Sequence, residues 1–174
     1  MLKTVETRQS SRTLAIGFLY LCAFTLAIQA LHLVEHTAQV VQKFVLHSTE
    51  AHGLIGRLDL EPVHFGFNLV YLIFLGLVFA GWVVCRHEIS KCSNYWATFA
   101  TVLFVGLVFQ MWHVVEHSVK LAQFLNTGMQ GTPGILGAHF DGVLMHFSYN
   151  WIVYLPLVLV VSGSRLYKLA GAKL

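Results

Sequence analysis

Two short stretches of the chain share the pattern His-x-x-Glu-His, at residues 32–36 and 113–117, and both lie inside long apolar runs. On an α-helix, positions i, i+3 and i+4 share one face, so each stretch points two imidazoles and one carboxylate in the same direction. Such polar groups need partners in apolar surroundings, and a metal ion satisfies several imidazoles and carboxylates at once. The chemistry that these residues predict is therefore metal binding.

Both motifs belong to a longer internal repeat. The His-x-x-Glu-His motif that begins at position 32 recurs at position 113, a shift of 81 residues. The Gly-x-x-Gly pattern at 53–56 recurs at 134–137 with the same shift. After one inserted residue, Asp-x4-His-Phe-x-Phe/Tyr-Asn at 59–68 recurs at 141–150. These matches predict two tandem helical hairpins, about 12–86 and 94–168, related by a pseudo-two-fold axis along the membrane normal.

The repeat adds one histidine to each half of the predicted site. Each of the four apolar segments has basic residues at one end and its histidines towards the other. At the rise of an α-helix, the distance along the helix axis from the basic residues to the histidines is about 30 Å in every segment. Inward-facing groups at one level of a four-helix bundle converge. The predicted metal ligands are His32, Glu35, His36, His64, His113, Glu116, His117 and His146.

Six imidazoles and two carboxylates are about what two metal ions require. Three histidines and one glutamate from each half would leave positions open for water, oxygen or a substrate. A mixed His/Glu set favours iron, with zinc, manganese or copper as alternatives. The four remaining histidines, His47, His52, His87 and His139, have no counterpart in the repeat and are interpreted as surface or loop residues.

Four other polar residues of the repeat are predicted to support the ligands. Asp59 and Asp141 precede the single histidine of each half by five residues, and either orient its imidazole or cap a helix N-terminus. Asn68 and Asn150 lie one helical turn beyond the same histidine. They either hold a water or substrate, or form a hydrogen bond between helices.

Membrane-spanning helices are the elements that must position these residues. The chain has 174 residues, of which 56% are hydrophobic and 11% charged, which is too apolar for an ordinary soluble domain. Four apolar segments are long enough to span a bilayer once the histidine-bearing stretches are included. The sequence predicts an all-α integral membrane protein, a four-transmembrane-helix bundle that forms a single domain over residues 1–174.

The expected helix limits follow from breakers and caps. Residues 1–12 are expected to form a polar lead, residues 86–94 a short turn, and Pro62 is placed to open the second helix. The predicted helices cover about 12–46, 62–85, 95–126 and 141–169.

The distribution of basic residues predicts the orientation. Lysine and arginine gather before the first segment, between the second and third, and after the fourth. The positive-inside rule then places both termini in the cytoplasm and the metal site towards the periplasmic or extracellular face. Nothing in this distribution indicates nucleic-acid binding. The expected partners are the lipid bilayer, a lipid-soluble substrate or electron donor, and either other subunits of a membrane complex or further copies of the chain.

Three functions are compatible with these features. The favoured hypothesis is a metal-dependent membrane oxidoreductase with a non-haem di-iron centre, acting on a lipid-soluble or small substrate. The second is a zinc-dependent membrane hydrolase that uses one glutamate as a base. The third is a non-catalytic carrier of haem or metal within a larger complex, although the paired glutamates would then have no role.

Overall fold

The computed structural model describes residues 2–56 and 60–164, and of residues 2–12 and 92 it describes the backbone alone. Every regular element in these ranges is helical. The elements are α1 (Leu2–Val40), the π-helix η1 (Val41–Val45), α2 (Glu61–Val84), α3 (Arg86–Cys92), α4 (Trp96–Thr127) and α5 (Gly142–Gly163).

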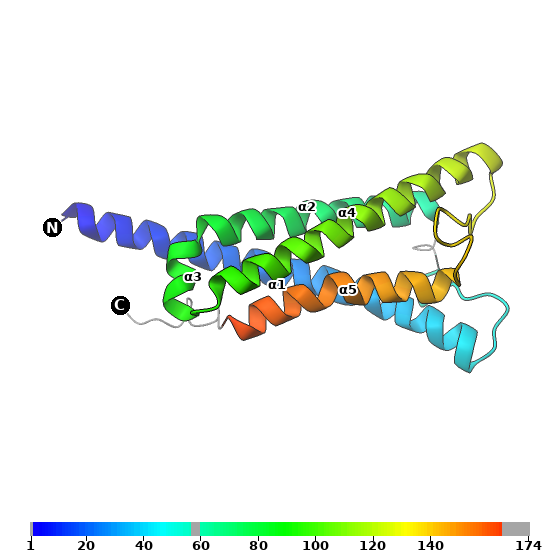
Figure 1. The fold of residues 1–174 in the computed structure, drawn as a ribbon, viewed down its shortest axis with the longest axis horizontal. Helices are drawn as coiled ribbons and strands as arrows, with labels where there is room; N and C mark the ends of the chain where they lie inside the picture. The colour runs from blue at the N-terminus through cyan, green and yellow to red at the C-terminus, as the bar shows by residue number, and fades with distance from the viewer. Residues whose placement is uncertain (1, 57–59, 165–174) are drawn as a thin grey trace.

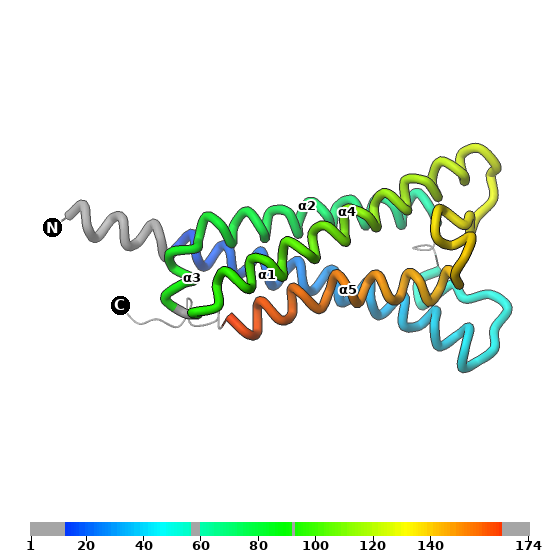
Figure 2. The backbone as a smooth tube through the Cα atoms, viewed as in Figure 1, coloured from blue at the N-terminus to red at the C-terminus, as the bar shows by residue number. Residues whose placement is uncertain are grey.

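The four long helices form an elongated bundle (Figure 1). Helix α1 packs against α5 and α2 packs against α4, as the backbone trace in Figure 2 also shows. The short helix α3 lies at one end of the bundle. The connecting segments 46–56 and 128–141 lie at the other end, which we call the loop end. The helices of the bundle diverge towards this loop end.

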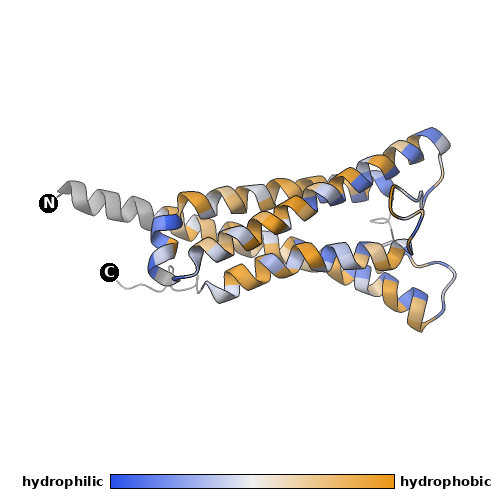
Figure 3. Ribbon diagram, in the orientation of Figure 1, coloured by the Kyte–Doolittle hydropathy of each residue, from blue (hydrophilic) through white to orange (hydrophobic). Residues whose placement is uncertain are grey.

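Four segments are long and apolar enough to cross a membrane: Thr13–Val45, Glu61–Val84, Trp96–Thr127 and Gly142–Gly163. Figure 3 shows the apolar residues along the length of these helices, with hydrophilic residues gathered at α3 and near the loop end. Many large apolar side chains point outward from the bundle, including Tyr20, Leu31 and Val84. An apolar outer surface of this kind is suited to lipid.

Local sequence explains where the helices begin and end. Pro62 lies in the first turn of α2, where a missing N–H costs nothing, as predicted. The side chain of Asp141 caps α5 by accepting hydrogen bonds from the backbone N–H groups of Val143 and Leu144. Helix α4 ends at Thr127, and its C-cap residue Gly128 has φ +71° and donates its N–H to the Phe124 carbonyl.

Apolar packing fills the half of the bundle near α3. Phe18, Trp82, Leu103 and Leu157 belong to one buried cluster that joins all four long helices. Most of the polar buried residues lie beyond this cluster, towards the loop end, while Ser164 is buried at the opposite end of α5. The apolar half therefore acts as a rigid base that sets the spacing of the helices at the site.

Two boundaries differ from the sequence predictions. Helix α1 begins at Leu2 and not near residue 12, because residues 2–12 contain neither Gly nor Pro and the helix continues through them. Residues 86–92 form the helix α3 where a turn was expected. Helix α5 ends at Gly163; the predicted extension to residue 169 lies outside the described residues.

Candidate metal centre

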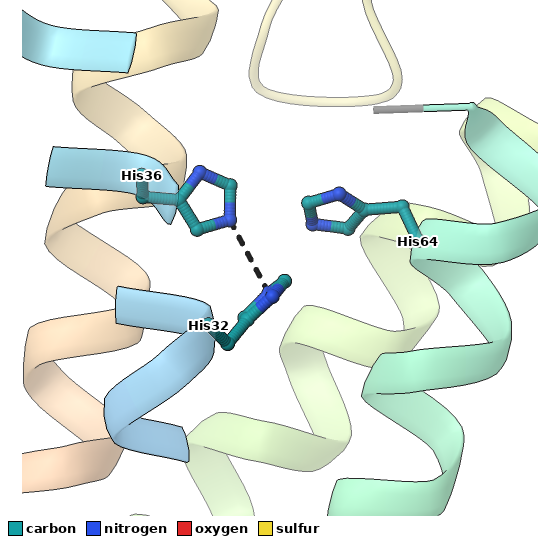
Figure 4. A group of neighbouring side chains, drawn as sticks. All are labelled: His32, His36 and His64. Atoms are coloured by element: carbon teal, nitrogen blue, oxygen red, sulfur yellow. Dashed lines mark hydrogen bonds between the residues drawn. The ribbon is translucent and has the colours of Figure 1, made fainter. Parts of the chain in front are cut away.

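Six buried histidines meet inside the bundle near the loop end. Helix α1 carries His32 and His36, α4 carries His113 and His117, and α2 and α5 each carry one near their N-termini, His64 and His146. None of the six is more than 6% exposed. Figure 4 shows three of them, His32, His36 and His64, turned towards one another across the space between α1 and α2.

The ring nitrogens lie at distances that suit metal coordination. Two groups, His32–His36–His64 and His64–His113–His117, each offer one nitrogen per residue with all of these atoms within 4.8 Å of one another. The Nε2 atoms of His32 and His36 are 3.2 Å apart. Two imidazoles on one tetrahedral ion with metal–nitrogen bonds of about 2.0–2.1 Å have a similar spacing, about 3.3 Å.

His146 completes a continuous cluster of rings. Its ring centroid lies 4.9 Å from that of His117 and 5.9 Å from that of His36, with which it is stacked. His64 lies 4.5 Å from His117 and 4.8 Å from His32, also measured between ring centroids. The six imidazoles predicted as ligands are thus brought together from all four long helices.

Most of these imidazoles have buried nitrogens that form no hydrogen bond within the described part of the chain. Both ring nitrogens of His113 and His117 are in this state, as are the Nε2 atoms of His64 and His146. A buried polar atom without a partner costs about 1–3 kcal/mol, and native proteins contain only a few per 100 residues. Because a neutral imidazole carries one N–H and one lone-pair nitrogen, each of these four rings has one nitrogen that could donate to a ligand.

Hydrogen bonds at the far side of two rings fix which nitrogen faces the cluster. His146 Nδ1 lies 2.6 Å from the Gly142 carbonyl oxygen. Since a carbonyl only accepts, Nδ1 of His146 carries the proton and Nε2 is left as an electron-pair donor. His36 Nδ1 lies 2.7 Å from Gln39 Oε1, which gives His36 the same arrangement. Metal-binding histidines are commonly oriented in this way.

The two glutamates of the motifs face the loops. Glu35 accepts hydrogen bonds from the backbone N–H groups of Leu54 and Ile55, and Glu116 accepts those of Ile135 and Leu136, all at 2.9–3.3 Å. Neither carboxylate belongs to the two groups of potential metal ligands. In this geometry each glutamate attaches a connecting loop, through hydrogen bonds to its backbone, to the helix that carries the histidine pair.

Glycine and glutamine complete these loop attachments. Gly53 (φ +77°) and Gly134 (φ +71°) lie against the carboxylates of Glu35 and Glu116, where a Cβ atom would overlap the carboxylate. Gln42 forms two hydrogen bonds with the backbone of Gly53, and Gln123 forms the equivalent pair with Gly134. Sequence reasoning missed both glutamines, although they are related by the same shift of 81 residues.

On the side of the histidines away from the loop end, two glutamines form hydrogen bonds with the asparagines that were predicted to support the ligands. Gln29 donates to Asn150 Oδ1 at 2.7 Å, and Gln110 donates to the backbone and side-chain oxygens of Asn68. Each asparagine also donates to the carbonyl of the histidine one turn earlier. The asparagines thus form hydrogen bonds between helices, which was one of the two interpretations. The glutamines were missed, yet each precedes a His-x-x-Glu-His motif by three residues.

The aspartates are only partly accounted for. Asp59 lies outside the described residues. Asp141 caps α5 and accepts a hydrogen bond from Lys43. Partial burial opposes ionisation of Asp141, but the bonds from Lys43 and from the Leu144 and Val143 N–H groups hold its pKa below the ordinary value. The N-cap interpretation therefore describes Asp141.

A cavity of about 270 Å³ opens from the loop end onto the histidine cluster. His36, His64, His117 and His146 line its inner part. Glu61 and Lys120, two further residues that sequence reasoning missed, line it as well and form an ion pair at 3.2 Å. The cluster is therefore accessible to a small molecule. The four histidines outside the repeat are exposed, as expected for surface or loop residues.

No family model, curated protein or solved structure matches this chain.

Proposed function

We propose that the protein is a membrane metalloprotein whose six buried histidines hold a dinuclear metal centre, and that it acts as an oxidoreductase. The observation that carries the proposal is the set of buried ring nitrogens without hydrogen-bond partners, gathered from four helices into one cluster. Two ions shared among the six imidazoles would each bind one nitrogen per ring and would leave coordination positions open towards the cavity.

The donor atoms narrow the choice of metal. The preference for iron rests on a mixed His/Glu set, but both glutamates accept hydrogen bonds from loop amides, and of their carboxylate oxygens Oε2 of Glu116 is buried and accepts none within the described residues. We therefore propose that imidazoles supply most of the donors. Imidazoles bind iron, copper and zinc, whereas manganese prefers oxygen donors. Iron and copper change oxidation state, and either ion would supply electron transfer to a small molecule bound at the open positions.

The arrangement of the rings favours two metal ions over haem. A bis-histidine haem needs a porphyrin between its axial ligands. Here the rings of His64, His117 and His146 lie against one another with centroids 4.5–5.7 Å apart. This close contact of imidazoles suits small ions that are bound directly between the nitrogens.

We also propose that the bundle is a tandem repeat with its metal centre towards the outer face of the membrane. In support, Glu35 and Glu116 hold equivalent loop amides, and Gln42 and Gln123 hold equivalent glycines. Basic Arg86 lies at the end of the bundle opposite the loops, which the positive-inside rule assigns to the cytoplasm.

A redox experiment tests the proposed activity. The purified chain is loaded with iron or with copper, and its absorption and electron paramagnetic resonance spectra are recorded before and after reduction with dithionite. We expect spectra that change on reduction and return on reoxidation in air, because both ions would lie in a site open to small molecules. A centre that takes up zinc in preference, or spectra that do not respond to reduction, would instead favour the hydrolase.

A further inference from the structure

The cavity above the histidines is small and polar. Its volume of about 270 Å³ lies just below the range of roughly 300–1,000 Å³ that is common for ligand pockets. At about 30 Å³ per water molecule it has room for roughly nine waters. Its wall contains Glu61, Lys120 and Thr132 as well as the histidines. These dimensions and this lining suit a small water-soluble molecule better than a long lipid-soluble one.

An ion pair is buried in the wall of this cavity. Glu61 Oε1 lies 3.2 Å from Lys120 Nζ, and the two side chains are 5% and 11% exposed. The other carboxylate oxygen of Glu61 lies 3.9 Å from His117 Nδ1. Burying two charges has a high desolvation cost and is weak evidence for a role in stability. Ionisable groups held inside a membrane bundle are, by default, candidates for a functional site.

The same two residues break the internal repeat. Lys120 occupies the position that Gln39 has in the first half, at the shift of 81 residues. Glu61 precedes His64 by three residues, as Val143 precedes His146 in the second half. Both departures lie beside His117, so the His117 side of the histidine cluster has a buried charged pair, whereas the Lys43–Asp141 pair of the cavity is more exposed. The two halves therefore differ in charge at the cavity, where the first half has Gln39 and the second has Lys120, and where the first has Glu61 and the second has Val143.

We propose that the cavity binds a small water-soluble anion, which Lys120 holds against the His117 side of the cluster while Glu61 positions the lysine. The inference rests on the metal centre proposed above. An ammonium group has three N–H donors, and the bond to Glu61 uses one of them. Bound metal ions would add the largest positive charges in the site and favour an anionic ligand further.

A double variant, Glu61→Val with Lys120→Gln, provides the test. Each substitution introduces the residue found at the equivalent position of the other half, and both charges are removed together, so neither remains buried alone. The metal-loaded wild type and variant are titrated with sodium azide, and binding is followed in the absorption spectrum. We expect at least a tenfold higher azide Kd in the variant, with unchanged metal content. An unchanged azide Kd would overturn the inference.

Matched controls separate the possible failures. Lys43→Gln removes a cavity lysine that is paired with Asp141. It should leave the azide Kd within about threefold of wild type, because the Lys43 side chain is 38% exposed and water screens its charge. A wild type that takes up no metal contradicts the proposed function itself, whereas normal metal uptake with no effect of the double variant contradicts only the anion site.

A second measurement needs no variant. On the metal-loaded wild type, azide should change the spectrum at lower concentration than acetonitrile, an uncharged molecule of similar size, and at lower concentration than decanol. Tighter binding of decanol would show that the cavity takes lipid-soluble molecules, and equal binding of acetonitrile would show that charge is not recognised. Either result would overturn the inference.

Discussion

Replacing His113 and His117 together with alanine is expected to lower the metal content of the loaded protein from about two ions per chain to about one. The pair supplies two of the three nitrogens in one of the potential ligand groups. A single remaining imidazole does not hold an ion against competition from buffer and chelator. The measurement is metal analysis of the detergent-purified variant after loading and desalting.

The matched control for this variant is His87→Ala, which removes an exposed histidine on α3 far from the cluster and should leave the metal content unchanged. The alanine pair should still fold, because the four ring nitrogens it removes form no hydrogen bonds. Retention of two ions by the folded variant would contradict the ligand assignment. Loss of metal from the His87 variant would show that uptake is not specific.

Gly134→Ala is expected to destabilise the protein by about 3–5 kcal/mol. About 1–2 kcal/mol comes from placing a side chain at φ +71°, where only glycine is free of strain. The rest comes from the Glu116 carboxylate, which the new Cβ atom would displace from the N–H groups of Ile135 and Leu136. Hydrogen bonds to a charged acceptor contribute about 1.5–3 kcal/mol each.

Gly128→Ala separates these two contributions. Gly128 also has φ +71°, but no atom lies within 4 Å of the position that its Cβ would take. This control should therefore cost only the backbone strain, about 1–2 kcal/mol. Thermal unfolding in detergent, followed by circular dichroism, gives the comparison. Equal losses of stability in the two variants would contradict the attachment of the loop to Glu116.

The helices and the meeting of the six histidines could be predicted from sequence, for different physical reasons. The long apolar runs and the few breakers determine where helices form, and Pro62 and Gly128 mark two of their limits. The histidines occupy inward positions at one depth, so packing the helices brings them together. The structure places His32 and His146, which are 114 positions apart, in the same cluster.

The direction of the glutamates could not be predicted. Helical periodicity places Glu35 on the same face as His32 and His36, but a long flexible side chain reaches partners above or beside that face. Backbone amides of the loop compete for the carboxylate, and the close approach of Gly53 makes this possible. Loop conformation is set by tertiary contacts, which the spacing of polar residues does not reveal.

Other parts of the site were detectable but overlooked. Extending the repeat by one helical turn before each His-x-x-Glu-His motif recovers Gln29 with Gln110, and extending it by nearly two turns after the motif recovers Gln42 with Gln123. Glu61 and Lys120 are found in the opposite way, by looking for charged residues whose counterparts in the other half are uncharged. In the tandem repeat that we propose, matching pairs identify the shared framework, and charged exceptions identify where the two halves differ in chemistry.

The most direct test of the metal centre is the metal content of the purified wild-type chain, measured by mass spectrometry together with its absorption spectrum. Six imidazoles arranged as they are here predict about two iron or copper ions per chain and no haem Soret band. A single zinc ion per chain would favour a hydrolase. A chain that contains no metal, and binds none when iron, copper or zinc is supplied, would contradict the central claim.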